Sequence, residues 1–118
     1  MKIKHLVVAL TAALTLAAPL DAKADPDIQI YRESKIDEIK NELIRLYISG
    51  VENGFKWANA SAELTHGVKL YCAPPELALT EDQIVSILDR YIEKESPEDS
   101  DPLGMILMFA LMDVFPCN

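Results

Sequence analysis

The chain has 118 residues, a formal net charge of −8 and two cysteines. This length fits a single domain behind a short leader. The excess of acidic residues argues against nucleic acid and anionic membrane surfaces as partners, because phosphate binding needs a basic face. A basic protein partner would be attracted to such a chain, although solubility alone also explains the charge.

Residues 1–24 have the pattern of a cleaved signal peptide. Two lysines precede an apolar run from Leu6 to Leu20, and Ala22-Lys23-Ala24 supplies small residues at positions −3 and −1 of a cleavage site. The run is shorter than the roughly 20 residues that span a bilayer, and an uncleaved membrane anchor is the alternative. We therefore expect export to the periplasm and a mature domain of residues 25–118.

The two cysteines, Cys72 and Cys117, are expected to form a disulfide. Export places them where disulfides persist, and a domain this small gains from a covalent tie. Two free thiols are the alternative. A metal site is a weaker one, because only His66 would remain as a soft ligand and the spacing matches no zinc pattern. No cofactor motif is present, so we expect neither a metal nor a cofactor.

The N-terminal part of the mature chain is expected to hold one long helix. Residues 25–32 read as a loose lead, and Ser34 can cap a helix from about 35 to 62. Apolar residues and glycines recur at spacings of three and four, and neighbouring residues widen the stripe, which runs through Ile36, Ile39, Leu43, Leu46, Tyr47, Gly50, Val51, Gly54 and Ala58. We expect this stripe to face the core.

The two glycines of the stripe, Gly50 and Gly54, each cost about 1 kcal/mol relative to alanine in a helix interior. The close approach of another helix at these positions would compensate for that cost. A kink in the long helix is the alternative.

A connection from about 62 to 80 follows the long helix. Gly67 is a candidate stop, and Cys72-Ala73-Pro74-Pro75 cannot continue a helix because proline lacks the backbone donor. Thr80-Glu81-Asp82-Gln83 fits a capping box, so a helix of about 14 residues is expected from Thr80 onward.

The last helix is expected from Leu103 to Phe115, with Asp101-Pro102 at its start. Residues 105–112 are apolar on every face, which indicates burial on all sides, a subunit interface, or both. The segment is too short to span a membrane. The predicted fold class is therefore all-α, a small bundle of three to four helices closed by one disulfide.

The segment between the last two helices is a candidate partner-binding loop. It contains four carboxylates and one proline, namely Glu95, Pro97, Glu98, Asp99 and Asp101. A solvated linker is the alternative interpretation. No catalytic constellation, nucleophile elbow or phosphate loop is present, so we expect a binding protein and not an enzyme.

Three segments resemble the type VI secretion amidase immunity (Rap/Tai) family: Tyr71-Cys72-Ala73-Pro74-Pro75, Leu79-Thr80-Glu81-Asp82-Gln83 and Phe115-Pro116-Cys117. Residues 50–59 are similar as well, and the resemblance covers about residues 40–117. It implies a periplasmic helical protein, commonly a homodimer, which binds a peptidoglycan amidase effector and covers its active-site cleft. Cys72 and Cys117 correspond to the family's disulfide, whereas no partner-contact residue carries over.

Two other interpretations remain open at this point. Acidity, export and a very apolar last helix also suit a periplasmic acid-stress chaperone with a single disulfide, in which protonation would expose residues 105–112. The third interpretation is an orphan interaction protein that has the same fold and a different partner.

Overall fold

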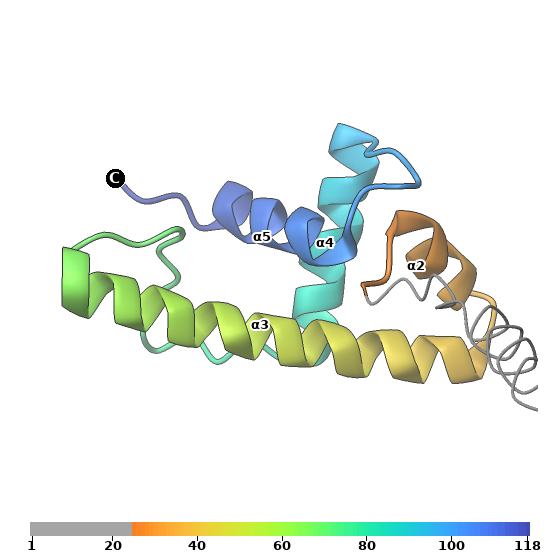
Figure 1. Ribbon diagram of the computed structural model, residues 1–118, viewed down its shortest axis with the longest axis horizontal. Helices are drawn as coiled ribbons and strands as arrows, with labels where there is room; N and C mark the ends of the chain where they lie inside the picture. The colour runs from red at the N-terminus through yellow and green to blue at the C-terminus, as the bar shows by residue number, and fades with distance from the viewer. Residues whose placement is uncertain (1–24) are drawn as a thin grey trace, which may run out of the picture.

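The computed structural model describes residues 25–118, and the predicted signal peptide lies outside the described residues. Within this range the chain forms four α-helices and no strand. These are α2 (Ile28–Ser34), α3 (Glu38–His66), α4 (Glu81–Glu95) and α5 (Leu103–Val114). The long helix α3 forms a base on which α2, α4 and α5 pack, and α4 also packs against α5 (Figure 1). The predicted all-α class is confirmed, as is the disulfide between Cys72 and Cys117.

The expectation of a loose N-terminal lead is wrong, because residues 28–34 form helix α2. Asp27 caps this helix by accepting a hydrogen bond from the Ile30 N–H at 3.0 Å. Ile28 and Tyr31 are buried in the core. A two-turn helix has little stability of its own, so the burial of these two side chains is what holds α2 in place.

The sequence context suggested that Ser34 caps the long helix, but the structure shows that it does not. It is buried, and its hydroxyl donates to the Tyr31 carbonyl at 2.6 Å. The cap of α3 is Asp37, whose carboxylate accepts from the Lys40 N–H at 3.0 Å. At the other end, Gly67 stops α3 in a left-handed conformation with φ of 68°. The helix therefore begins three residues later and ends four residues later than expected, and the predicted glycine stop is confirmed.

Of the apolar stripe that was expected to face the core from α3, only Tyr47 and Val51 pack against it. Ile36, Ile39, Leu43 and Leu46 are between 62% and 93% exposed, whereas Ile44 and Ile48 are buried. The half-buried Tyr47, Val51 and Phe55 extend the inner face. Helix α3 thus carries two apolar faces, and hydrophobic periodicity alone does not tell which face meets the core.

The two glycines on the outer face have no helix packed against them. A Cβ atom added at Gly50 or Gly54 would meet no atom within 4 Å, and both residues lie within an unbroken helix. The expected close approach occurs instead at Gly104 of α5. A Cβ atom there would lie 3.0 Å from the Tyr47 hydroxyl, so any larger residue would displace this side chain where α5 crosses α3.

Helix α4 begins as predicted. Thr80 accepts from the Gln83 N–H at 3.2 Å, and the Gln83 side chain accepts from the Thr80 N–H at 2.9 Å, which completes the capping box. Arg45 of α3 forms ion pairs with Glu81 and Asp82 in the first turn of α4. These pairs fix the start of α4 beside the middle of α3.

Helix α5 is central but is not covered on every side. Its inner face supplies much of the core through Leu103, Ile106, Leu107, Ala110 and Leu111, all of them buried. The outer residues Met105, Phe109 and Met112 are 42%, 41% and 38% exposed. The expectation of burial on all sides is therefore wrong, because α3 and α4 cover only part of α5. Among the described residues, no helix has the length and apolarity that crossing a membrane requires.

Candidate partner-binding surfaces

The acidic loop between α4 and α5 is ordered by contacts with α2. The Gln29 N–H donates to the Asp99 carbonyl at 3.0 Å, and the Ile28 N–H donates to the Asp101 carbonyl at 3.1 Å. The Arg32 guanidinium lies 2.9 Å from the Asp99 carboxylate. The loop is therefore fixed to the N-terminal helix at two backbone positions and one side chain.

The five predicted loop residues divide into two groups. The Asp99 carboxylate pairs with Arg32, and the Asp101 carboxylate accepts from the Glu98 N–H at 2.9 Å, so both maintain the loop conformation. Glu95 and Glu98 are exposed, and within residues 25–118 the only ion pair of either carboxylate joins Glu95 to Lys94 at 3.6 Å. Pro97 is half-buried beside Arg32. Glu95, which is the last residue of α4, and Glu98 in the loop are therefore the two carboxylates of this segment that are exposed to a partner.

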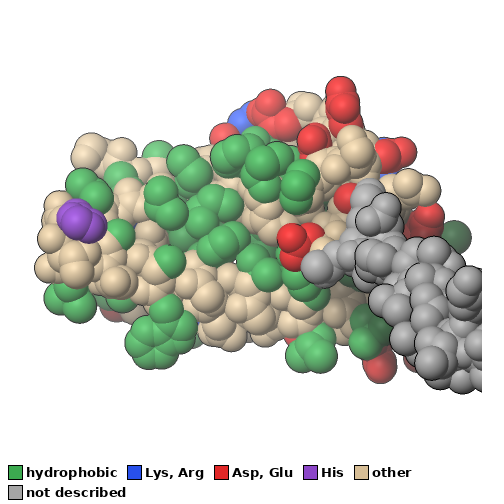
Figure 2. Space-filling model, viewed as in Figure 1, with side chains coloured by type: hydrophobic (Ala, Val, Ile, Leu, Met, Phe, Trp, Pro, Cys, Tyr) green, Lys and Arg blue, Asp and Glu red, His purple; other side chains and the backbone are tan. Residues whose placement is uncertain are grey.

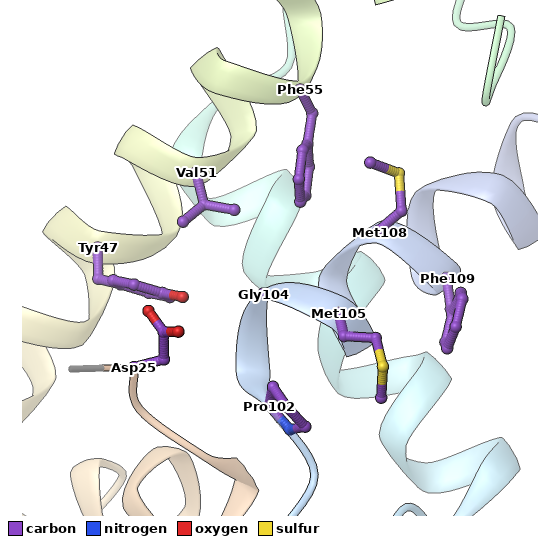
Figure 3. Close-up of a pocket in the computed structure, with 9 residues that line it drawn as sticks. All are labelled: Asp25, Tyr47, Val51, Phe55, Pro102, Gly104, Met105, Met108 and Phe109. Atoms are coloured by element: carbon purple, nitrogen blue, oxygen red, sulfur yellow. The ribbon is translucent and has the colours of Figure 1, made fainter. Parts of the chain in front are cut away.

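An apolar groove begins where the acidic loop ends. Its walls come from α3 and α5, and it is lined by Asp25, Tyr47, Val51, Phe55, Pro102, Gly104, Met105, Met108 and Phe109. Figure 3 shows Val51, Phe55 and Met108 directed into the space between the two helices. In Figure 2 this region forms a broad hydrophobic surface with acidic side chains beside it. The groove and the acidic loop therefore form one continuous surface.

Asp25 gives the groove one charged end. Its carboxylate lies beside the Tyr47 hydroxyl in Figure 3, and burial together with this negative charge raises the pKa of Tyr47. The phenol stays neutral at physiological pH and can donate a hydrogen bond. The groove was not predictable from the sequence, because its residues are not adjacent there and only the approach of α5 to Tyr47 brings them together.

The connection from Gly67 to Thr80 is held against α3 by a buried side chain, Asn59. The Asn59 amide donates to the Tyr71 carbonyl at 2.8 Å and accepts from the Leu70 N–H at 2.9 Å. The Cys72 N–H donates to the Phe115 carbonyl at 2.8 Å, next to the disulfide. Asn59 and the disulfide thus fix this segment from two sides.

The buried polar groups outside these surfaces stabilise the packing of the helices. Glu52 is 3% exposed and pairs with Lys56 at 2.9 Å, while Tyr31 donates to Asp89 at 2.5 Å. Burial, followed by the hydrogen bond to Asp89, raises the pKa of Tyr31. Within the described part of the chain, no three His, Cys, Asp or Glu side chains come together in an arrangement that could hold a metal ion.

Comparisons with known proteins add no relative. No family model matches the chain, and neither does any curated protein or solved structure.

Proposed function

We propose that this protein is an exported immunity protein. In this role it binds a peptidoglycan amidase delivered by type VI secretion and inhibits it by covering the active-site cleft. The observation that carries the proposal is the acidic loop held by α2 beside the apolar groove, because a binding surface that is ordered before it meets its partner loses less entropy on association. The protein acts by binding, and its own side chains perform no reaction.

The arrangement around the disulfide supports this assignment. The segments that resemble the immunity family, Tyr71–Pro75 and Phe115–Cys117, lie together through the disulfide and the Cys72–Phe115 backbone hydrogen bond. The tie keeps the end of α5 beside the connection that leads to α4. It therefore supports the helices that form the groove and carry the loop.

Charge and apolar surface define the partner that this face fits. Glu95 and Glu98 would meet basic or polar groups at the rim of the amidase cleft, while the groove accepts an apolar side chain next to them. The excess of acidic over basic residues accelerates encounter with a basic surface, and this effect weakens as salt screens it.

The periplasm is the compartment in which this function would be exercised. The disulfide is compatible with an oxidising compartment, and residues 1–24 have the sequence pattern of an export signal. Peptidoglycan lies in the same compartment, so an amidase inhibitor would be placed where the enzyme acts.

The test uses the oxidised protein, a candidate amidase and purified peptidoglycan. We expect the protein to stop hydrolysis at near-equimolar ratio and to bind the amidase in calorimetry. Replacing Glu95 and Glu98 with serine should weaken binding at least ~10-fold and reduce its salt dependence. The control replaces Glu38 and Glu93, which are exposed acids outside both the loop and the connection from Gly67 to Thr80, and keeps the wild-type affinity. Asp99 and Asp101 are left in place, because their loss would disturb the loop itself.

Two outcomes count against the proposal at different levels. Equal affinity of the loop variant and the wild type would remove the loop from the mechanism and leave the groove and the connection as the binding surface. Failure to bind or inhibit any amidase of the type VI class would overturn the immunity function.

The exposed apolar side chains favour a second candidate, an acid-stress chaperone. Met105, Phe109 and Met112 are accessible on α5 without any dissociation step. Such a protein would suppress aggregation of client proteins near about pH 2–3, where carboxylates are protonated. Suppression there without amidase binding would favour this function over immunity.

A further inference from the structure

All the methionines of residues 25–118 lie on one face of α5, at positions 105, 108 and 112. Their spacings of three and four place them on the same side of the helix, and Phe109 lies between them. We call Met105, Met108, Phe109 and Met112 the methionine face. Its members are exposed except for Met108, which is half-buried. Methionine side chains are flexible and polarizable, so such a face adapts to apolar partners of different shapes.

The wall of the groove opposite the methionine face belongs to α3 and carries no charge. Tyr47, Val51 and Phe55 form this wall, as Figure 3 shows. Gly54 and Ala58 lie seven positions after Tyr47 and Val51, so they extend the same side of the helix, and both are exposed. A Cβ atom added at Gly54 would meet nothing within 4 Å. Because these residues are small, another helix can approach the backbone of α3 closely along the groove.

The size of the groove suits the apolar face of a short helix. From Pro102 to Met112, α5 extends over about 15 Å, which is close to three turns of helix. The space between the two walls has a volume of about 410 Å³ and is open to solvent on one side. An open groove of this length accepts apolar side chains that are spaced at i, i+4 and i+7 on a helix lying across its mouth.

The charged side chains at the two ends of the groove are acidic. Asp25 lines one end, and its carboxylate forms no ion pair within residues 25–118. At the other end, Asp113 follows the methionine face and lies 2.8 Å from the Lys94 ammonium, which also lies 3.6 Å from the Glu95 carboxylate. Two carboxylates therefore share one ammonium group there, so both ends of the groove are negative.

The basic side chains elsewhere on the described surface do not neutralise this charge. Within residues 25–118, every lysine and arginine except Arg90 already forms an ion pair with a carboxylate. Acidic residues outnumber basic ones in the chain. A partner that carries lysine or arginine is therefore attracted to the groove, whereas an acidic one is repelled.

We propose that the groove binds a basic amphipathic helix. Its apolar side chains lie on the methionine face, and its lysine or arginine side chains lie over Asp25 and Asp113. The inference rests on the proposed function only where it expects the amidase to carry this helix, because the groove and its charges are described without reference to any partner.

A labelled synthetic peptide tests the groove without any amidase. The peptide has about four helical turns, with leucine at every third or fourth position and lysine on the flanks. Fluorescence anisotropy with the purified, oxidised protein should show one-to-one binding that weakens as salt is added. A peptide of the same composition whose leucines are spread around the helix should bind at least ~10-fold more weakly. Equal binding of the two peptides would overturn the proposal.

Phe109→Ser removes the aromatic side chain of the methionine face and should weaken peptide binding at least ~10-fold. Phe109 is 41% exposed, so the fold should remain intact, which far-UV circular dichroism checks. The matched control is Trp57→Ser, which removes an exposed aromatic side chain about 160° around α3 from Phe55 and should keep the wild-type affinity. Asp25→Asn should reduce the salt dependence. Equal affinity of Phe109→Ser and the wild type would overturn the proposal.

Oxidation of the methionine side chains gives a second readout that needs no substitution. Hydrogen peroxide transfers one oxygen atom to each thioether and leaves water, so an apolar side chain becomes polar. Within the described residues there is no free thiol to compete for the oxidant. The oxidised protein should lose peptide binding, and a methionine sulfoxide reductase should restore it. Unchanged affinity after oxidation of Met105 and Met112 would overturn the proposal.

Two other occupants of the groove would give different results. A second copy of the chain would appear in sedimentation equilibrium as a dimer that Phe109→Ser dissociates in the absence of peptide. A lipid surface would appear as binding to phosphatidylcholine vesicles that depends on Phe109, without peptide binding. Either result would overturn the proposal. Peptide binding together with failure to inhibit any amidase would support the proposal and count only against the immunity function.

Discussion

Loss of the Asn59 side chain should loosen the connection that carries Cys72. In Asn59→Ala, two hydrogen bonds of 2.8 and 2.9 Å disappear, and a carbonyl and an N–H group lose their partner. Each bond contributes about 1 kcal/mol net, and partly buried groups left unpaired cost more, so we expect a loss of about 2–4 kcal/mol. This is a large share of a total stability of roughly 5–15 kcal/mol.

The assay is urea denaturation followed by far-UV circular dichroism. The matched control is Asn53→Ala on the exposed side of the same helix. It reports the gain in helix propensity from asparagine to alanine, about 0.6 kcal/mol, without the loss of a buried contact. The changes in the free energy of unfolding of the two variants should therefore have opposite signs. If Asn59→Ala unfolds at the same urea concentration as Asn53→Ala, the two Asn59 hydrogen bonds make no net contribution to stability and the reasoning is refuted.

Three further changes test other parts of the scaffold. Replacing Cys72 and Cys117 with serine should cost about 4 kcal/mol for a closed loop of 45 positions, and wild-type protein kept in reductant should unfold at the same urea concentration. Gly67→Ala should lower stability by about 1–2 kcal/mol because φ there is 68°, whereas Gly54→Ala should raise it; equal signs in thermal melts would contradict this. Burial raises the pKa of Tyr31, so its contribution to the free energy of unfolding is complete below about pH 10 and falls at higher pH by about 1.4 kcal/mol per pH unit. Tyr31→Phe should reduce this slope in urea titrations.

Local signals in the sequence predicted the elements that they specify directly. The capping box at Thr80, the stop at Gly67 and the pairing of Cys72 with Cys117 were all confirmed. Each of these depends on a few neighbouring residues or, for the disulfide, on there being only two cysteines. Such features require no knowledge of how the helices are arranged.

Features that depend on packing were not predictable in this way. Helix α2 forms because Ile28 and Tyr31 are buried in the core, and the short sequence 28–34 does not predict this burial. The inner face of α3 was assigned largely to the wrong side because the exposed residues Ile39, Leu43 and Leu46 have the more regular spacing. Regular spacing is equally expected of a face that pairs with another chain.

The candidate surface was predicted only in part. The acidic composition of residues 95–101 identified the loop, while the structural roles of Asp99 and Asp101 depend on Arg32 and on the fold of the loop itself. The apolar groove depends on Gly104, whose neighbour Tyr47 lies far away in the sequence. Whether these surfaces bind an amidase stays a prediction.

The backbone hydrogen bonds between the N-terminal segment and the loop before α5 join these two parts into one unit for local opening. The N–H groups of Ile28 and Gln29 donate to loop carbonyls, and the Leu103 N–H donates to Pro26. Amide hydrogen exchange at these three positions should therefore proceed at a common rate, because no one of them can open alone. A partner that binds the loop would slow amide hydrogen exchange at Gln29 even without contacting this residue. The exchange rate of Gln29 would therefore measure binding at the loop.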